Sequence, residues 1–196
     1  RLTDFEVVRT IDGAAIDVKA DDVTIDGVTI DVNAKGVNDT FAIRAFESNG
    51  LQLVNNDITF NAGNISSTAT LHAIDIRNSN NVKVKKNNIN AKLPALTAVW
   101  TAYGIDQDHP LAVGIQGCEN VTFAGNDVVA NVKEGNYYDT LDTMMVYGVT
   151  NIEIADNKFT ETANTADGLV LCLYALDLYS INGATVSGND ILVDTT

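Results

Sequence analysis

The chain has little proline, cysteine or histidine, with two of each among its 196 residues. Neither cysteine belongs to a CxxC pair, and so few thiols and imidazoles argue against a zinc site. No run of about eighteen apolar residues occurs, so the sequence predicts no helix that spans a membrane. The chain opens at Arg1 without a signal peptide, and we expect residues 1–196 to be one domain excised from a longer surface protein.

Basic residues are also scarce relative to acidic ones. Lys and Arg together number 12 against 26 Asp and Glu, which gives a formal net charge of −14. Such a charge repels nucleic acid and anionic lipid, so we expect neither as a partner of this chain. It also slows the approach of a polyanionic substrate, which disfavours an enzyme that degrades acidic sugars.

What the chain does contain is a repeated phrase of eight residues: apolar, any, apolar, any, any, Asn, any, apolar. It occurs at Leu51–Ile58, Val82–Ile89, Val121–Val128, Ile152–Phe159 and Ala184–Ile191. The asparagines are Asn56, Asn87, Asn126, Asn157 and Asn189, and an earlier copy at Val23–Ile30 has Val28 in their place. Copies at such regular intervals indicate a repeat architecture in which each unit stacks on its neighbours.

A second apolar alternation precedes each copy of the phrase. Its members are Ile16–Val18, Ile43–Ala45, Ile74–Ile76, Val113–Ile115, Met144–Val146 and Leu176–Leu178. Alternation with a period of two predicts strands with one buried face. Each coil is therefore expected to contain two short strands, a bend at the asparagine and a third strand that begins near Ile58, Ile89, Val128, Phe159 or Ile191.

The asparagine has two expected roles. Asn tolerates left-handed backbone, so we predict that it forms the bend itself. Stacked asparagines can also hydrogen-bond to one another from coil to coil as a ladder. A hairpin protein would instead show Asn-Gly turns, which the sequence lacks.

The paired alternations and the phrase ending in Asn-x-Ile resemble the repeats of the pectate-lyase-like superfamily, over roughly residues 14–193. The resemblance implies an all-β fold, a right-handed parallel β-helix of about six coils. The acidic, Asn-rich pattern is most similar to adhesin-like surface proteins of methanogenic archaea and bacteria, which implies a secreted, cell-surface location. The Asn-Thr-Asp, Asp-Asp, His-Gly and Arg-Ile-Lys motifs of polygalacturonase-like hydrolases do not occur at the matching strands.

Two outward columns of the first strand carry candidate site residues. The first column reads Asp17, Arg44, Asp75, Gly114, Met145 and Asp177, and the second reads Lys19, Phe46, Arg77, Gln116, Tyr147 and Tyr179. Asp17, Arg44 and Asp75 form either an acid–base cluster in a sugar groove or, as we favour, a charge ladder that neutralises itself. Tyr147 and Tyr179 are either a stacking surface for a sugar ring or ordinary strand formers.

The spacing between ladder positions is 28, 31, 39, 31 and 32 residues, and all of this variation falls in one connection of the coil. The longest insertion, residues 91–111, contains Trp100, Tyr103, Asp106 and His109. The next connection contains Tyr138 and Asp142. We predict that the two connections wall a shallow binding cleft over the first sheet. The alternative is that Trp100 pins its loop to the flank of the solenoid.

Together these patterns favour a non-catalytic, adhesin-like module that binds a polysaccharide or another cell surface, with no cofactor and no metal. One alternative is a polysaccharide lyase or glycoside hydrolase that acts in the groove along the first sheet, for which Asp75, Asp177 and Asp142 are the candidate acids. Another is a stalk segment that only spaces other domains. The Asp- and Asn-rich turns need no calcium, since turn preference explains them.

Overall fold

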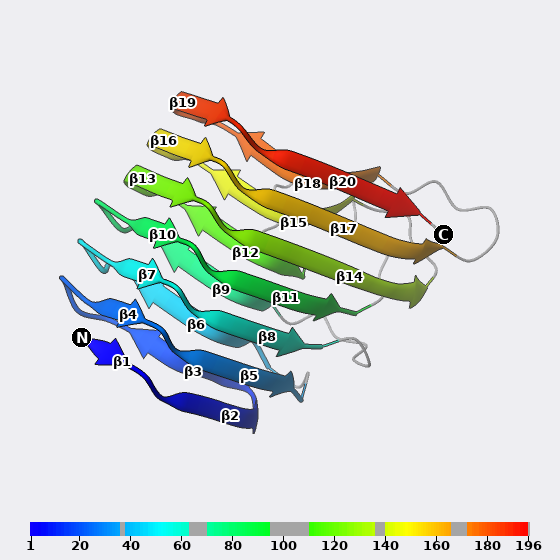
Figure 1. The fold of residues 1–196 in the computed structure, drawn as a ribbon, viewed down its shortest axis with the longest axis horizontal. Helices are drawn as coiled ribbons and strands as arrows, with labels where there is room; N and C mark the ends of the chain where they lie inside the picture. Colours follow the sequence, from blue (N-terminus) through cyan, green and yellow to red (C-terminus); the bar gives the residue numbers. More distant parts are fainter. Residues whose placement is uncertain (36–37, 63–69, 95–109, 136–139, 166–171, 196) are drawn as a thin grey trace.

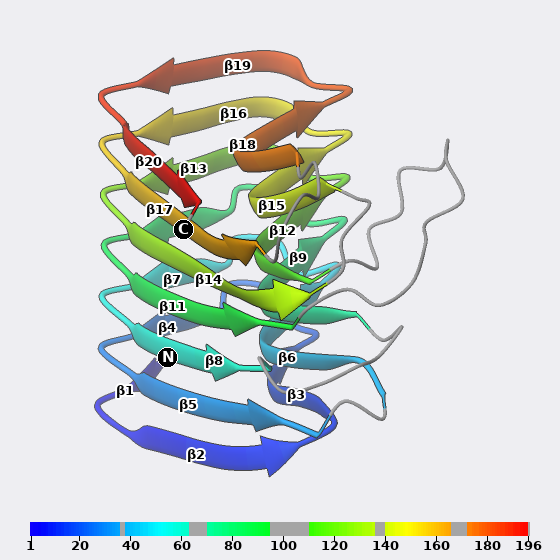
Figure 2. The ribbon, with the colours of Figure 1, turned by 90° about the vertical axis from the view of Figure 1, so that its right-hand side faces the viewer.

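The computed structural model describes residues 1–35, 38–62, 70–94, 110–135, 140–165 and 172–195. In this part of the chain every regular element is a β-strand, and the strands form three parallel sheets. Successive coils stack along one axis, so that each sheet contains one strand from each coil (Figures 1 and 2). The predicted all-β parallel solenoid is therefore confirmed. The right-handed winding of the solenoid and the count of about six coils stay predictions.

We name the sheets A, B and C. Sheet A contains β1 (Leu2–Thr3), β4 (Thr24–Asp26), β7 (Gln52–Val54), β10 (Lys83–Lys85), β13 (Glu119–Ala124), β16 (Thr150–Ala155) and β19 (Asn182–Ser187). Sheet B contains β2 (Glu6–Ile11), β5 (Thr29–Ala34), β8 (Asp57–Asn61), β11 (Asn88–Leu93), β14 (Asp127–Gly135), β17 (Lys158–Thr165) and β20 (Asp190–Thr195). Sheet C contains β3 (Gly13–Val18), β6 (Thr40–Phe46), β9 (Leu71–Arg77), β12 (Leu111–Gln116), β15 (Thr140–Tyr147) and β18 (Cys172–Tyr179).

The core consists of inward columns of apolar side chains, one rung above the next. In sheet B, Ile30, Ile58, Ile89, Val128 and Phe159 occupy one register position and are all buried. Sheet A contributes the column Ile25, Leu53, Val84, Phe123 and Ile154. Burying one such side chain contributes about 1.5–3 kcal/mol, so the columns supply most of the favourable free energy of folding.

The asparagine ladder is present, but the backbone bend lies one residue earlier than predicted. Asn56, Asn87, Asn126 and Asn157 each donate from the backbone N–H and from Nδ2 to the Oδ1 of the next ladder asparagine. The left-handed residues are those just before them: Gly27, Asn55, Lys86, Gly125, Asp156 and Gly188. The prediction that the asparagine itself forms the left-handed bend was wrong. Its carboxamide must point into the coil to bond, which leaves the turn conformation to its neighbour.

Sheet C departs from strict alternation at one place in each strand. Both Ala73 and Ile74 belong to the buried core, as do Ala112 and Val113 one coil further on. Two consecutive inward residues put His72 and Asp75 on the same, outward side of the strand. This irregularity creates the local geometry of the candidate site. No helix among the described residues has the length and hydropathy needed to cross a bilayer.

Candidate functional site

The outward side of sheet C carries three columns of side chains. The first contains Phe41, His72, Leu111, Asp142 and Tyr174; the second contains Arg44, Asp75, Gly114, Met145 and Asp177; the third contains Phe46, Arg77, Gln116, Tyr147 and Tyr179. Neighbouring members of a column are about 4.8 Å apart along the solenoid axis. The columns therefore bring residues from successive coils within reach of one ligand.

His72, Asp75 and Arg77 form a hydrogen-bonded group on β9. His72 Nδ1 lies 3.2 Å from Asp75 Oδ1, and Arg77 Nε lies 3.0 and 2.9 Å from the two Asp75 oxygens. Burial on its own raises the pKa of Asp75, but the contacts with His72 and Arg77 outweigh it and hold the pKa below its ordinary value. Asp75 is therefore an anion at neutral pH and is unsuited to act as a general acid.

Access to this group is restricted. His72 and Asp75 are 1 % and 2 % exposed. The hollow beside them has a volume of about 10 Å³, and Gly114 and Met145 are among its lining residues. A hollow of this size holds one water molecule at most, so a sugar ring cannot enter it. The arrangement fixes the position of Arg77 rather than offering His72 or Asp75 to a substrate.

Gly114 makes the buried pair possible. A Cβ atom at this position would lie 3.1 Å from His72 Nδ1 and 3.4 Å from Asp75 Oδ1. A side chain at this position would press on the imidazole and require it to shift by a few tenths of an ångström. The absence of a side chain at Gly114 thus has a packing role that the sequence pattern did not reveal.

The Asp17–Arg44 pair is separate from this group, although Asp17, Arg44 and Asp75 are consecutive in register as predicted. Arg44 binds Asp17 through two hydrogen bonds of 3.0 and 2.9 Å, and the pKa of Asp17 falls to about 2 mainly because of them. Lys19 adds a 2.8 Å ion pair to the same carboxylate. The charge ladder that we favoured is thus formed between Asp17 and its basic neighbours, while Asp75 pairs with His72 and Arg77.

The accessible part of this face is the third column, which we call the strip: Phe46, Arg77, Gln116, Tyr147 and Tyr179. Tyr147 and Tyr179 stack with their ring centroids 5.6 Å apart and their planes at 16°. Tyr179 is 50 % exposed, and the side chain of Arg77 is 29 % exposed. Arg77 uses only Nε for Asp75, so both of its terminal amino groups remain without a hydrogen-bond partner among the described residues.

The corner after sheet C holds the strip in line. The residue that follows each strip position has a left-handed backbone: Glu47, Asn78, Gly117, Gly148 and Ser180. From the first four of these the backbone N–H donates to the carbonyl of the strip residue on the next coil, at 2.8–3.1 Å. The strip is therefore fixed by main-chain hydrogen bonds at its edge, which orders its side chains before any ligand arrives.

The structure brings some of the predicted site residues together and not others. Arg77, Tyr147 and Tyr179 lie in the strip, and Asp75 lies buried directly behind Arg77. Asp142 is buried in the first column, away from the strip. Trp100, Tyr103, Asp106, His109 and Tyr138 lie outside the described residues, so the predicted cleft wall stays a prediction. His72 was not among the predicted site residues, because strict alternation would place it on the side opposite to Asp75.

A buried acid lies inside the solenoid near this face. Glu161 occupies the inward column of sheet B beside Ala130 and Val193 and is 0 % exposed. Burial raises its pKa to about 8; the Thr143 hydroxyl opposes this shift and the charge of Asp142 adds to it. Neither carboxylate oxygen has a hydrogen-bond partner of good geometry among the described residues. No group of three or more His, Cys, Asp or Glu in that part of the chain is arranged to hold a metal ion.

Comparisons with known proteins give no relative from which a function could be transferred. No family model, no curated protein and no solved structure matches the chain. The functional argument therefore depends on the geometry of the site alone.

Proposed function

We propose that the chain is a non-catalytic glycan-binding module of the pectate-lyase-like, adhesin-like type, displayed outside the cell. Its ligand is a polysaccharide or cell-surface glycan that lies along the strip on sheet C. The observation that carries the proposal is the stack of Tyr147 on the half-exposed Tyr179, in line with Arg77 and Gln116. Flat aromatic faces beside amide and guanidinium donors suit a ring that has apolar faces and hydroxyl edges.

Two further features support binding of a glycan without its cleavage. The groups capable of acid–base work, His72 and Asp75, are buried behind Arg77, and the hollow next to them is too small for a sugar. The low pKa of Asp75 also keeps it ionised, whereas glycosidases need one protonated carboxyl group. The strip itself contains no carboxylate, so it has neither of the two acids that a glycosidase uses.

The test is binding of the purified chain to an immobilised glycan array, with release of reducing ends followed on every glycan that binds. We expect retention of one glycan class without product. Retention should fall in a Tyr147→Ala, Tyr179→Ala double variant and persist in Tyr174→Ala. Tyr174 is a matched control because it is 46 % exposed on the same strand, β18, but lies in another column. Absence of binding to any glycan would leave the stalk segment as the better description.

A polysaccharide lyase or hydrolase is the second candidate, and the hydrogen bond between His72 and Asp75 favours it. Such an enzyme would release product from a bound glycan, and Asp75→Asn would stop the release while binding continued. Product formation that is lost in Asp75→Asn would overturn the non-catalytic proposal.

A further inference from the structure

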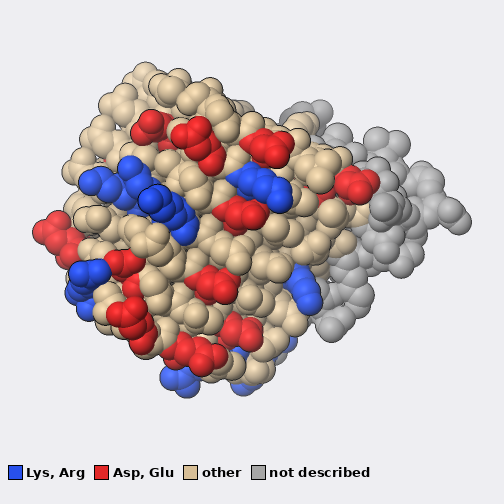
Figure 3. Space-filling model, viewed as in Figure 1, with Lys and Arg blue, Asp and Glu red and all other residues tan. Residues whose placement is uncertain are grey.

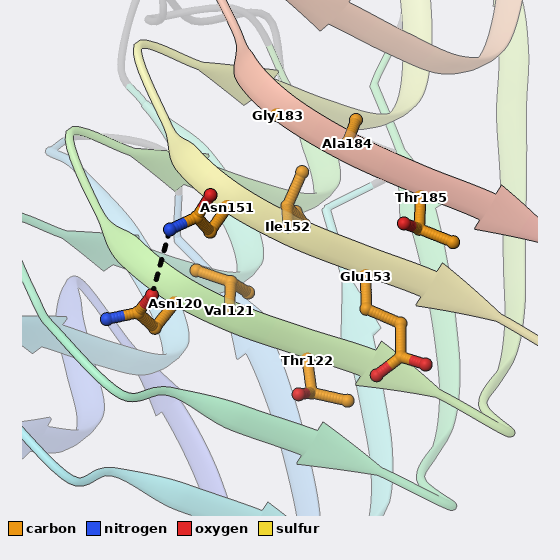
Figure 4. A pocket seen from close by; sticks show the side chains of 9 residues that line it. All are labelled: Asn120, Val121, Thr122, Asn151, Ile152, Glu153, Gly183, Ala184 and Thr185. Carbon is orange, nitrogen blue, oxygen red and sulfur yellow. Dashed lines mark hydrogen bonds between the residues drawn. The ribbon is translucent and has the colours of Figure 1, made fainter.

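A second concave surface lies on sheet A, across the corner from the strip. It is an open groove of about 430 Å³ over β13, β16 and β19 (Figure 4). Six polar or glycine positions define it: Asn120, Asn151 and Gly183 along one margin, and Glu153 with Thr122 and Thr185 on either side of it along the other. None of these residues contributes to the strip.

The first margin is a ladder of exposed asparagine carboxamides that ends at Asn151. Asn151 Nδ2 donates to Asn120 Oδ1 at 3.2 Å, and Asn120 Nδ2 donates to Asn81 Oδ1 at 3.4 Å. All three asparagines have left-handed backbones, and the next position in register is Gly183, which has no side chain. Asn151 Oδ1 therefore faces open space above Gly183 and accepts no hydrogen bond from a described residue (Figure 4).

The second margin consists of Thr122, Glu153 and Thr185, which pair in register on three adjacent strands. Their side chains are about 4.8 Å apart along the axis. None of them has a side-chain hydrogen bond or an ion pair with a described residue, and Glu153 is exposed. The groove thus presents two hydroxyl donors, one carboxylate and one carboxamide oxygen toward the same space.

Glu153 is the only charged residue of the groove. After Lys158 the chain contains no Lys or Arg, so nothing in the last coil opposes its negative charge. On the face seen in Figure 3, which includes sheet A, acidic and basic side chains both occur, and Lys83 is the register neighbour of Thr122 on the side away from Glu153. Charge complementarity therefore favours a ligand with a positive group and disfavours uronic acids and sulfated sugars.

We propose that this groove binds an amino-sugar residue of a glycan. The protonated amine pairs with Glu153, and ring hydroxyls bond to Thr122, Thr185 and Asn151 Oδ1. A lysine side chain would need apolar walls along its methylene stem. Of the three apolar lining residues, Val121 and Ile152 are only 2–3 % exposed, and Ala184, which is exposed, has a single methyl group, too small to form such a wall. This site is independent of the strip, so either proposal can fail without the other.

The test uses the ¹⁵N-labelled chain titrated with β-1,4-glucosamine tetrasaccharide, at low salt and at a pH where the amine is protonated. We expect the side-chain amide signals of Asn120 and Asn151 to shift in a saturable way. The fully N-acetylated tetrasaccharide, which has no charge, should bind more weakly and give smaller shifts at the same concentration. Equal shifts with both sugars would overturn the assignment of an amino sugar, and shifts confined to other residues would overturn the site.

Two variants and one control sharpen the test. Glu153→Gln should weaken binding by about threefold, the scale of one exposed ion pair. Gly183→Asn should abolish it, because Asn accepts left-handed backbone and its carboxamide would extend the ladder over Asn151 Oδ1. Glu6→Gln removes the same charge from sheet B, outside the groove, and should leave binding unchanged. Unaltered affinity in both Glu153→Gln and Gly183→Asn would refute the proposal.

Discussion

Asn126 accepts two hydrogen bonds from Asn87 on a single oxygen, from the backbone N–H at 2.9 Å and from Nδ2 at 3.0 Å. It then repeats the same pair of bonds to Asn157 and donates from Nδ2 to the carbonyl of Val84. The side chain of Asn126 thus satisfies two buried main-chain groups of the preceding coil, and Asn126 bonds to the side chain of Asn157 on the following coil. The ladder links the strand register of one coil to that of the next.

Asn126→Ala should lower the free energy of unfolding by about 3 kcal/mol. The substitution removes the side-chain partners of the Asn87 N–H and the Val84 carbonyl, while Asn87 Nδ2 keeps its bond to the Leu53 carbonyl. Each buried group that loses its partner costs about 1–3 kcal/mol. Urea unfolding measures the difference. Asn88→Ala is the control, because Asn88 is exposed and makes one side-chain bond to Asp57; its effect should stay within about 0.5 kcal/mol. Equal effects would contradict a structural role for the ladder.

Glu161 should make the protein less stable as the pH rises from about 4.5 to 8. Its pKa is 4.5 unfolded and about 8 folded, so within this window the folded state binds the extra proton. The free energy of unfolding then falls with pH, by up to about 1.4 kcal/mol per unit, and levels off above pH 8. Urea unfolding across this range measures the slope. Glu161→Gln should flatten it and Glu6→Gln should not; a wild-type slope that survives Glu161→Gln would contradict the account.

Gly114→Ala should destabilise the protein by about 1–3 kcal/mol, because the added methyl group would press on His72 and Asp75. In a His72→Ala background the same substitution should destabilise the protein less, because removal of the imidazole leaves room for the added methyl group. Thermal or urea unfolding of the four chains gives the coupling energy. If the effects of Gly114→Ala and His72→Ala on the free energy of unfolding simply add, the account of Gly114 as a spacer for the His72–Asp75 pair is wrong.

Cys118 should resist thiol reagents in the folded state. It is buried, and burial raises its pKa to about 11, so little thiolate forms near neutral pH. A Cys172→Ser background leaves this one thiol to follow. Reaction with a disulfide reagent should be slow for the native chain and fast in denaturant. Fast modification of the native chain would show that the corner which contains Cys118 opens readily.

The sequence determined the fold well because its signals repeat in every coil. Period-two alternation and the fixed asparagine phrase place Ile58, Ile89 and Val128 in one buried column, as the register shows. The bend was misplaced by one residue because Asn, Asp, Lys and Gly all occur at the left-handed position before the ladder. No single residue type marks that position, whereas asparagine recurs at the next one. The bend was therefore predicted at the asparagine.

The site was less predictable. Arg77, Tyr147 and Tyr179 follow directly from the outward column, but the group formed by His72 and Asp75 depends on two consecutive inward residues, Ala73 and Ile74. Alanine is small enough to be accommodated beside isoleucine on the inner side, and alternation alone cannot signal this. The burial of Asp75 likewise arises from how the whole chain packs around sheet C and not from its local pattern.

The most direct measurement is the affinity of Tyr179→Ala for the glycan that the wild-type chain retains, determined by calorimetry beside Tyr174→Ala. If the strip is the binding surface, losing the exposed ring of the Tyr147–Tyr179 stack should weaken binding at least about fivefold, roughly 1 kcal/mol. Tyr174→Ala, on the same strand, should bind as wild type does. Unchanged affinity in Tyr179→Ala, or equal losses in both variants, would contradict the account.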